Sequence, residues 1–159
     1  MTTCLFIFGT RPEAIKCAPL ILALQKDPSY SVKICVTAQH RSMLDDVLSF
    51  FSITPDWDLQ VMQEGASLLD VSQRCMTAFQ PVFEDCQPDQ VIVQGDTTSA
   101  FMGALAAYYQ QVPVVHIEAG LRSGDLSSPF PEEGNRKLIA QLATLHFAPT
   151  DQSKQHLLK

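Results

Sequence analysis

Short apolar runs alternate with longer segments of helical pattern along the whole chain, and this alternation restricts the fold more than any other feature. Glycine, proline or polar residues bound the runs, whose length and composition are typical of buried strands. The expected strands are Cys4–Phe8, Val32–Thr37, a short one around Trp57–Val61, Gln90–Gln94, Val112–Ile117 and Leu145–Ala148. Apolar strands separated by helices predict an α/β fold with a doubly wound parallel sheet.

The segments between these runs predict the helices. They are expected from Gly9–Glu13 to Asp27, from Gln39–Arg41 to Phe51, over Ser67–Cys86, Thr98–Gln110 and Glu132–Ala143, and from Thr150 onward. The first helix has an expected apolar side made of Ile15, Pro19, Leu20, Leu22 and Leu24. Pro19 should kink or break this helix, and Pro81 should interrupt the third. The last helix shows no C-cap signal before Lys159, which indicates a fragment of a longer protein or a helix that continues into a second domain.

Composition excludes several classes of function. The chain has 159 residues, of which 46% are hydrophobic and 18% charged, as expected of one soluble globular domain. Its net charge is -6 and no run of Lys or Arg occurs, so nucleic acid and anionic membranes are poor partners. Neither a signal peptide nor a membrane-spanning run is recognisable. The five cysteines lack metal-binding spacing and indicate reduced, mostly buried thiols in a cytosolic protein.

Charged residues follow several of the expected strands. Asp96 comes just after one strand and Glu118 just after the next, while Arg11 and Lys16 follow the first. Glu132 comes after a loop that is longer than a simple connection needs. Because the carboxyl ends of parallel strands meet at one edge, these side chains should lie together. Clustered carboxylates raise one another's pKa, so the pattern predicts proton transfer on a phosphate-bearing ligand.

Each of these residues also has a simpler structural interpretation. Asp96 could be a helix N-cap, and the Gly9–Glu13 segment an ordinary capped turn. Glu132 could complement a helix dipole, with Arg136 as its exposed partner one turn on. His116 is better interpreted as a core histidine than as a base.

Five segments together resemble one known family. They are FGTRPEAIK (8–16), VTAQHRSML (36–44), GDTTS (95–99), HIEAGLRSGD (116–125) and PFPEEGNR (129–136). In this order and spacing they are similar to the non-hydrolysing UDP-N-acetylglucosamine 2-epimerases of bacteria. The resemblance covers essentially the whole chain.

The resemblance implies an isomerase that interconverts UDP-N-acetylglucosamine and UDP-N-acetylmannosamine for cell-surface polysaccharide biosynthesis, in the cytoplasm and as a homodimer. The family has a GT-B-type fold of two Rossmann-like domains with the active site between them. Residues 1–159 would be the N-terminal domain, and the C-terminal domain that binds most of UDP would be absent. We therefore expect the chain alone to be inactive.

The family's mechanism implies roles for the residues found above. The C2 proton is removed as UDP leaves C1, 2-acetamidoglucal forms, and UDP adds back after protonation on the opposite face. Neither a metal nor a nicotinamide is needed. By resemblance, Asp96, Glu118 and Glu132 are catalytic, with the face on which each acts left open. The substrate-binding residues would be Arg11, Lys16 and Arg136.

Bacterial members of the family are activated by their own substrate at a second site. Gln39, His40 and Glu133 match residues around that site. Ser42 stands where the family often has Gln or Glu, and Cys17 where Met is more usual. Two other functions stay open from the sequence: half of a GT-B glycosyltransferase, and a non-catalytic ligand-binding module.

Overall fold

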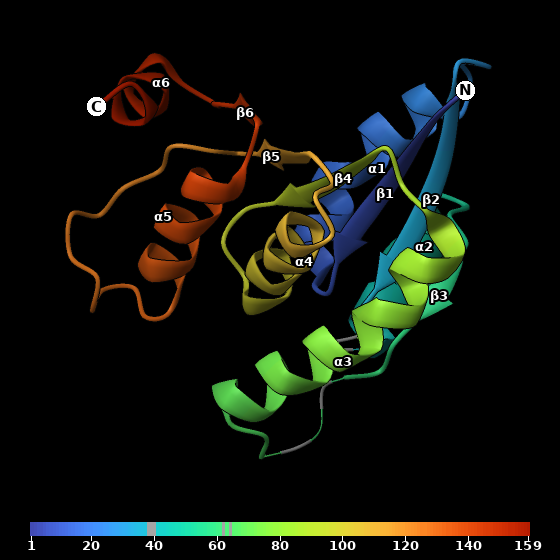
Figure 1. The fold of residues 1–159 in the computed structure, drawn as a ribbon, viewed down its shortest axis with the longest axis horizontal. Helices are drawn as coiled ribbons and strands as arrows, with labels where there is room; N and C mark the ends of the chain where they lie inside the picture. Colours follow the sequence, from blue (N-terminus) through green and yellow to red (C-terminus); the bar gives the residue numbers. More distant parts are fainter. Residues whose placement is uncertain (38–40, 62, 64) are drawn as a thin grey trace.

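The computed structural model describes residues 1–37, 41–61, 63 and 65–159. In this part of the chain six parallel strands form one sheet in the order β3-β2-β1-β4-β5-β6 (Figure 1). The strands are β1 (Thr2–Phe8), β2 (Tyr30–Val36), β3 (Trp57–Asp58), β4 (Gln90–Gln94), β5 (Val114–Ile117) and β6 (Leu145–Phe147). This is the strand order of a Rossmann-like sheet, so the predicted fold class is confirmed.

Helices connect the strands at the expected places. They are α1 (Arg11–Leu24), α2 (Arg41–Phe50), α3 (Leu68–Cys86), α4 (Thr98–Tyr109), α5 (Glu132–Leu142) and α6 (Asp151–Leu157). One apolar cluster joins the sheet to α1 and α2, and another joins it to α3, α4 and α5. Alternate residues of β1 supply both clusters, because successive side chains of a strand point to opposite faces. This explains why β1 is apolar throughout.

Helix α1 buries mainly small residues: Ala14, Cys17 and Ala18 are buried together with Ile21. Of the predicted apolar side, Leu20, Leu22 and Leu24 are partly buried and pack against the same core cluster, whereas Ile15 is 43% exposed and Pro19 is exposed, so those two positions were wrong. Small side chains allow the helix axis to approach the sheet closely.

Two prolines do not interrupt their helices as predicted. Pro19 lies within α1 and Pro81 within α3. Both are exposed, so the backbone carbonyl that loses its helical partner can bond to water.

The prediction of unpaired, mostly buried thiols is confirmed. All five thiols are free, and Cys4, Cys17, Cys35 and Cys75 are buried. Among the described residues, no helix is both long enough and apolar enough to span a membrane.

Candidate functional site

An open pocket of about 490 Å³ lies at the carboxyl ends of β1, β4 and β5. Neighbouring strands β1 and β4 send their following helices, α1 and α4, to opposite faces of the sheet. A crevice at such a switch point is where open α/β sheets bind ligands. The pocket is lined by Thr10, Pro12, Glu13, Lys16, Leu68, Gln94, Gly95, Asp96, Thr97, Thr98, Glu118, Pro131, Glu132 and Asn135.

The expected carboxylates meet in this pocket. Asp96, Glu118 and Glu132 all line it, together with Lys16. Arg11 is exposed at the first position of α1 and is not part of the lining. The predicted residues Gln39 and His40 lie outside the described residues. No group of three or more metal-ligating side chains occurs in the part of the chain that the structure describes.

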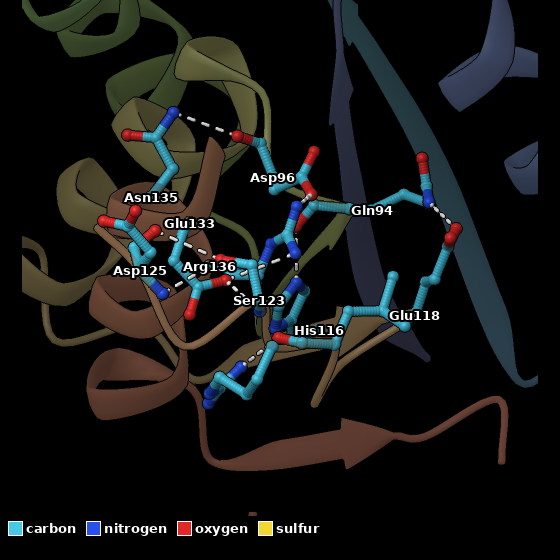
Figure 2. A network of polar contacts seen from close by, with 12 residues as sticks. Gln94, Asp96, His116, Glu118, Ser123, Asp125, Glu133, Asn135 and Arg136 are labelled. Carbon is cyan, nitrogen blue, oxygen red and sulfur yellow. Dashed lines mark hydrogen bonds and ion pairs between the residues drawn. The ribbon is translucent and has the colours of Figure 1, made fainter. Parts of the chain in front are cut away.

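Glu118 directly follows β5 in the chain and has an unusual backbone conformation. Its side chain has two hydrogen-bond partners. Its φ angle is 63°, in the left-handed region that non-glycine residues seldom adopt. The Lys16 ammonium donates to Glu118 Oε2 at 2.5 Å. Gln94 Nε2 donates to the same oxygen (Figure 2). Gln94 was not predicted as a site residue, although a glutamine ending an apolar strand was a signal that could have found it.

Asp96 is held by α5. Its carboxylate Oδ2 accepts from Arg136 Nη2 at 2.6 Å, and its backbone carbonyl accepts from Asn135 Nδ2 at 2.9 Å (Figure 2). Burial raises the pKa of Asp96 above its ordinary value; Arg136 opposes this shift, while Glu132 and Glu118 add to it. A carboxyl with a raised pKa suits general acid–base catalysis.

The simpler interpretation of Asp96 as a helix cap was wrong. Thr97 caps α4 instead, since its hydroxyl accepts from the amide of Ala100 at 3.0 Å. Asp96 therefore remains free to pair with Arg136.

Arg136 does not form the exposed pair with Glu132 that the spacing predicted. Its side chain is 13% exposed and bridges Asp96 and the fully buried Glu133, whose Oε2 lies 3.3 Å from Nη1. Glu133 also accepts from the backbone amides of Ser123 at 3.0 Å and Gly124 at 3.4 Å. Burial opposes ionisation of Glu133, but these amides and the cations of Arg136 and Lys137 outweigh it and lower its pKa.

Glu13 is a buried carboxylate at the bottom of the pocket. Its Oε2 accepts from the amides of Gly9 at 3.0 Å and Thr10 at 2.7 Å, and its Oε1 accepts from the hydroxyl of Thr97 at 2.7 Å. It thus joins the start of α1 to the start of α4. Burial raises the pKa of Glu13, while the bonds from Thr10, Thr97 and Gly9 oppose that rise.

His116 is a core histidine, as the sequence predicted. It is 1% exposed, and Nε2 lies 2.7 Å from the carbonyl of Gly95. A neutral ring donating from Nε2 fits this contact. Burial lowers the pKa of His116 to about 4. The residue supports the turn before Asp96 and is poorly suited to accept a proton near neutral pH.

This burial predicts a loss of stability in mild acid. The folded pKa of about 4 lies below the ordinary value of 6.5, so the unfolded chain binds the proton more readily between these values. As pH falls from 6.5 towards 4, we expect His116 to remove about 3 kcal/mol of unfolding free energy. Urea unfolding at pH 7 and pH 4.5 should show a smaller loss for His116→Gln than for the wild type. Equal losses would contradict the assignment.

Comparisons with known proteins place relatives beside this chain. The family model described as UDP-N-acetylglucosamine 2-epimerase matches residues 22–159. The UDP-N-acetylglucosamine 2-epimerases of Salmonella typhimurium and Escherichia coli K12 are 57% and 56% identical over 155 residues, which is 98% of this chain. The chain spans only 41% of the length of either relative.

Solved structures show the same similarity. The crystal structure of UDP-GlcNAc 2-epimerase from Neisseria meningitidis bound to UDP-GlcNAc superposes with a TM-score of 0.96 at 53% identity, covering 99% of this chain and 42% of that one. Acinetobacter baumannii MurG matches with a TM-score of 0.60 at 17% identity, over 92% of this chain and 40% of that one. The similarity to MurG concerns the fold alone, and it is a similarity to one half of a GT-B-type fold.

Proposed function

This chain belongs to the UDP-N-acetylglucosamine 2-epimerase family, and we propose on that basis that it forms the carboxylate-bearing wall of an active site that interconverts UDP-N-acetylglucosamine and UDP-N-acetylmannosamine. The observation that carries the proposal is the meeting of Asp96, Glu118 and Glu132 around one pocket at the switch point of the sheet. A site that moves a proton at C2 needs such groups on both sides of the sugar ring.

The proposed reaction proceeds by elimination and re-addition. One carboxylate takes the proton from C2 while the C1–O bond to UDP breaks, which yields 2-acetamidoglucal and UDP. A carboxylic acid then returns a proton to the opposite face of C2, and UDP bonds again to C1. Asp96, Glu118 and Glu132 are the proposed acids and bases, and the raised pKa of Asp96 favours it as a proton donor.

The cations have supporting roles in this proposal. Lys16 lines the pocket and pairs with Glu118, and its proposed role is to contact the diphosphate; Arg136 pairs with Asp96, and its proposed role is to orient that carboxyl group. Arg11, exposed at the start of α1, is proposed as a further substrate contact. A second substrate site near Gln39, His40 and Glu133 stays a prediction, as do a homodimer and a cytoplasmic location. The remaining recognition of UDP is assigned to polypeptide beyond the matched 41% of the relatives.

A chimera provides the test. This chain, joined to the part of the Salmonella typhimurium relative that follows the matched segment, should convert UDP-N-acetylglucosamine in deuterated water and place deuterium at C2. The chain alone should show no measurable exchange, because its pocket is open on one side. Mass spectrometry and proton NMR of the sugar would report both products.

Two controls make the result decisive. The intact relative is the positive control, and UDP binding by calorimetry shows that the chimera has formed its nucleotide site. A folded chimera that binds UDP without C2 exchange would overturn the proposal. Transfer of the sugar to an added acceptor, without label at C2, would instead support a glycosyltransferase.

A further inference from the structure

We propose that Glu133 is a positioning residue, which holds Arg136 against Asp96 and so couples the loop between β5 and α5 to the charge balance of the pocket. The inference rests on the proposed function only in treating Asp96 as a catalytic residue. It goes beyond that function because Glu133 itself neither lines the pocket nor faces a ligand there.

A continuous chain of polar contacts runs from this loop to Asp96 (Figure 2). The amides of Ser123 and Gly124 donate to the two carboxylate oxygens of Glu133 at 3.0 and 3.4 Å. Glu133 Oε2 then lies 3.3 Å from Arg136 Nη1, and Arg136 Nη2 donates to Asp96 Oδ2 at 2.6 Å. Each contact joins groups of opposite charge or a donor to an acceptor.

The burial of Glu133 fixes this series of polar contacts at its end far from the pocket. Glu133 is completely buried, and a buried carboxylate is costly unless donors satisfy it. The two loop amides and Arg136 supply those donors, with Lys137 Nζ 3.5 Å away. If the loop amides move, the carboxylate loses half of its anchoring and must move with them or stay unsatisfied.

The guanidinium of Arg136 has few other constraints. Its Nε is buried and has no hydrogen-bond partner among the described residues. The contacts of Nη1 with Glu133 and of Nη2 with Asp96 therefore set its orientation. Since an arginine side chain is long and flexible, loss of the Glu133 contact should release the guanidinium from Asp96.

The contact with Arg136 favours the ionised form of Asp96 against burial and the neighbouring glutamates. The charged groups that face it are Arg136 and Glu132 from α5 and Glu118 from the end of β5, whose own partner is Lys16. Arg136 is the cation in direct contact, while both glutamates oppose ionisation of Asp96. A displaced Arg136 leaves Asp96 facing carboxylates and favours its protonated form.

Two substitutions of Glu133 separate position from charge. Glu133→Gln removes a negative charge, which by itself favours ionised Asp96, and also removes the anchor of Arg136, which disfavours it. Glu133→Asp keeps the charge but shortens the reach. If Glu133 acts by positioning Arg136, both variants should raise the titration midpoint of Asp96 by roughly half to one pH unit. Carbon-13 NMR of the Asp96 carboxyl group in the 159-residue chain would measure this without substrate.

The sign of the shift decides between the two roles. A lower midpoint in Glu133→Gln, with no change in Glu133→Asp, would mean that Glu133 acts only through its charge and would overturn the proposal. An unchanged midpoint in both would also overturn it. Lys137→Gln is the matched control, because it removes another partner of Glu133 without touching Arg136, and its midpoint should stay at the wild-type value.

A double-mutant cycle tests whether Glu133 acts through Arg136. In an Arg136→Met background, Glu133→Gln should no longer raise the Asp96 midpoint, whereas a full shift there would exclude the route through Arg136. In the chimera, Glu133→Gln should displace the pH profile of C2 exchange in the direction of the NMR shift. An inactive wild-type chimera would count against the proposed function, while the NMR result would still decide the role of Glu133.

Discussion

Replacing Glu118 by Gln in the chimera should slow deuterium exchange at C2 about 10³-fold, the usual size of the effect when a general acid or base is removed. Glu118 lies at the carboxyl end of β5, lines the pocket and receives hydrogen bonds from Lys16 and Gln94. The amide of Gln has nearly the same shape and still accepts from Lys16, but it cannot take a proton from carbon. Exchange measured by NMR under saturating substrate would give the rate.

The controls separate chemistry from folding. Glu84→Gln changes an exposed glutamate of α3 that bonds Gln80, far from the pocket, and should leave exchange unchanged. Thermal unfolding of the Glu118→Gln chimera should stay close to that of the parent. A fall in rate below tenfold, with substrate still bound, would remove Glu118 from the catalytic residues.

Gly120→Ala should reduce the unfolding free energy of the chain by about 4 kcal/mol, because it combines backbone strain with a steric clash. The φ angle of Gly120 is 90°, which residues with a side chain rarely adopt. A Cβ placed there would lie 2.2 Å from the backbone oxygen of Ser153 in α6. His156 of the same helix also contacts the Gly120 carbonyl at 3.0 Å. Urea unfolding followed by circular dichroism would measure the loss.

Other glycines of this chain separate the two causes. Gly124 has a φ of 87° with open space around it, so Gly124→Ala should cost only about 1 kcal/mol from strain. Gly134 lies inside α5, again with nothing nearby, and Gly134→Ala should stabilise by about 0.5–1 kcal/mol. If Gly120→Ala cost no more than Gly124→Ala, the close packing of α6 on the loop would be wrong.

The sequence predicted the sheet well because a strand buried on both faces leaves a simple signature. The run Cys4–Phe8 needs no partner information to be recognised as buried, since both layers of helices select the same apolar character. Helix α1 was harder, because Ala14 and Cys17 pack inward while Ile15 faces outward. Hydrophobicity alone predicts that Ile15 is buried. The small residues are buried instead because the helix lies close to the sheet.

The meeting of the three carboxylates was predictable, whereas several of their contacts were not. That Asp96, Glu118 and Glu132 would meet followed from parallel strands ending at one edge. The partner of Arg136 did not follow, because spacing within α5 favours Glu132 and says nothing of Asp96, which is 40 residues away in the chain. Likewise the Gly9–Glu13 segment could be interpreted as an ordinary capped turn, whereas Glu13 also accepts a hydrogen bond from Thr97 at the start of α4.

The position of Glu13 has a consequence for the electric field of this wall. The N-termini of α1 and α4 each carry roughly half a positive charge, and together they would form an attractive site for a phosphate. The Glu13 carboxyl group lies buried between them and offsets that sum in its ionised form, which burial disfavours by raising its pKa. The other titratable side chains among the described lining residues are Asp96, Glu118, Glu132 and the single cation Lys16, while Arg136 lies behind Asp96 as its ion-pair partner. With carboxyl groups outnumbering cations in the lining, we expect this wall to hold an anionic nucleotide by short-range contacts rather than by electrostatic steering.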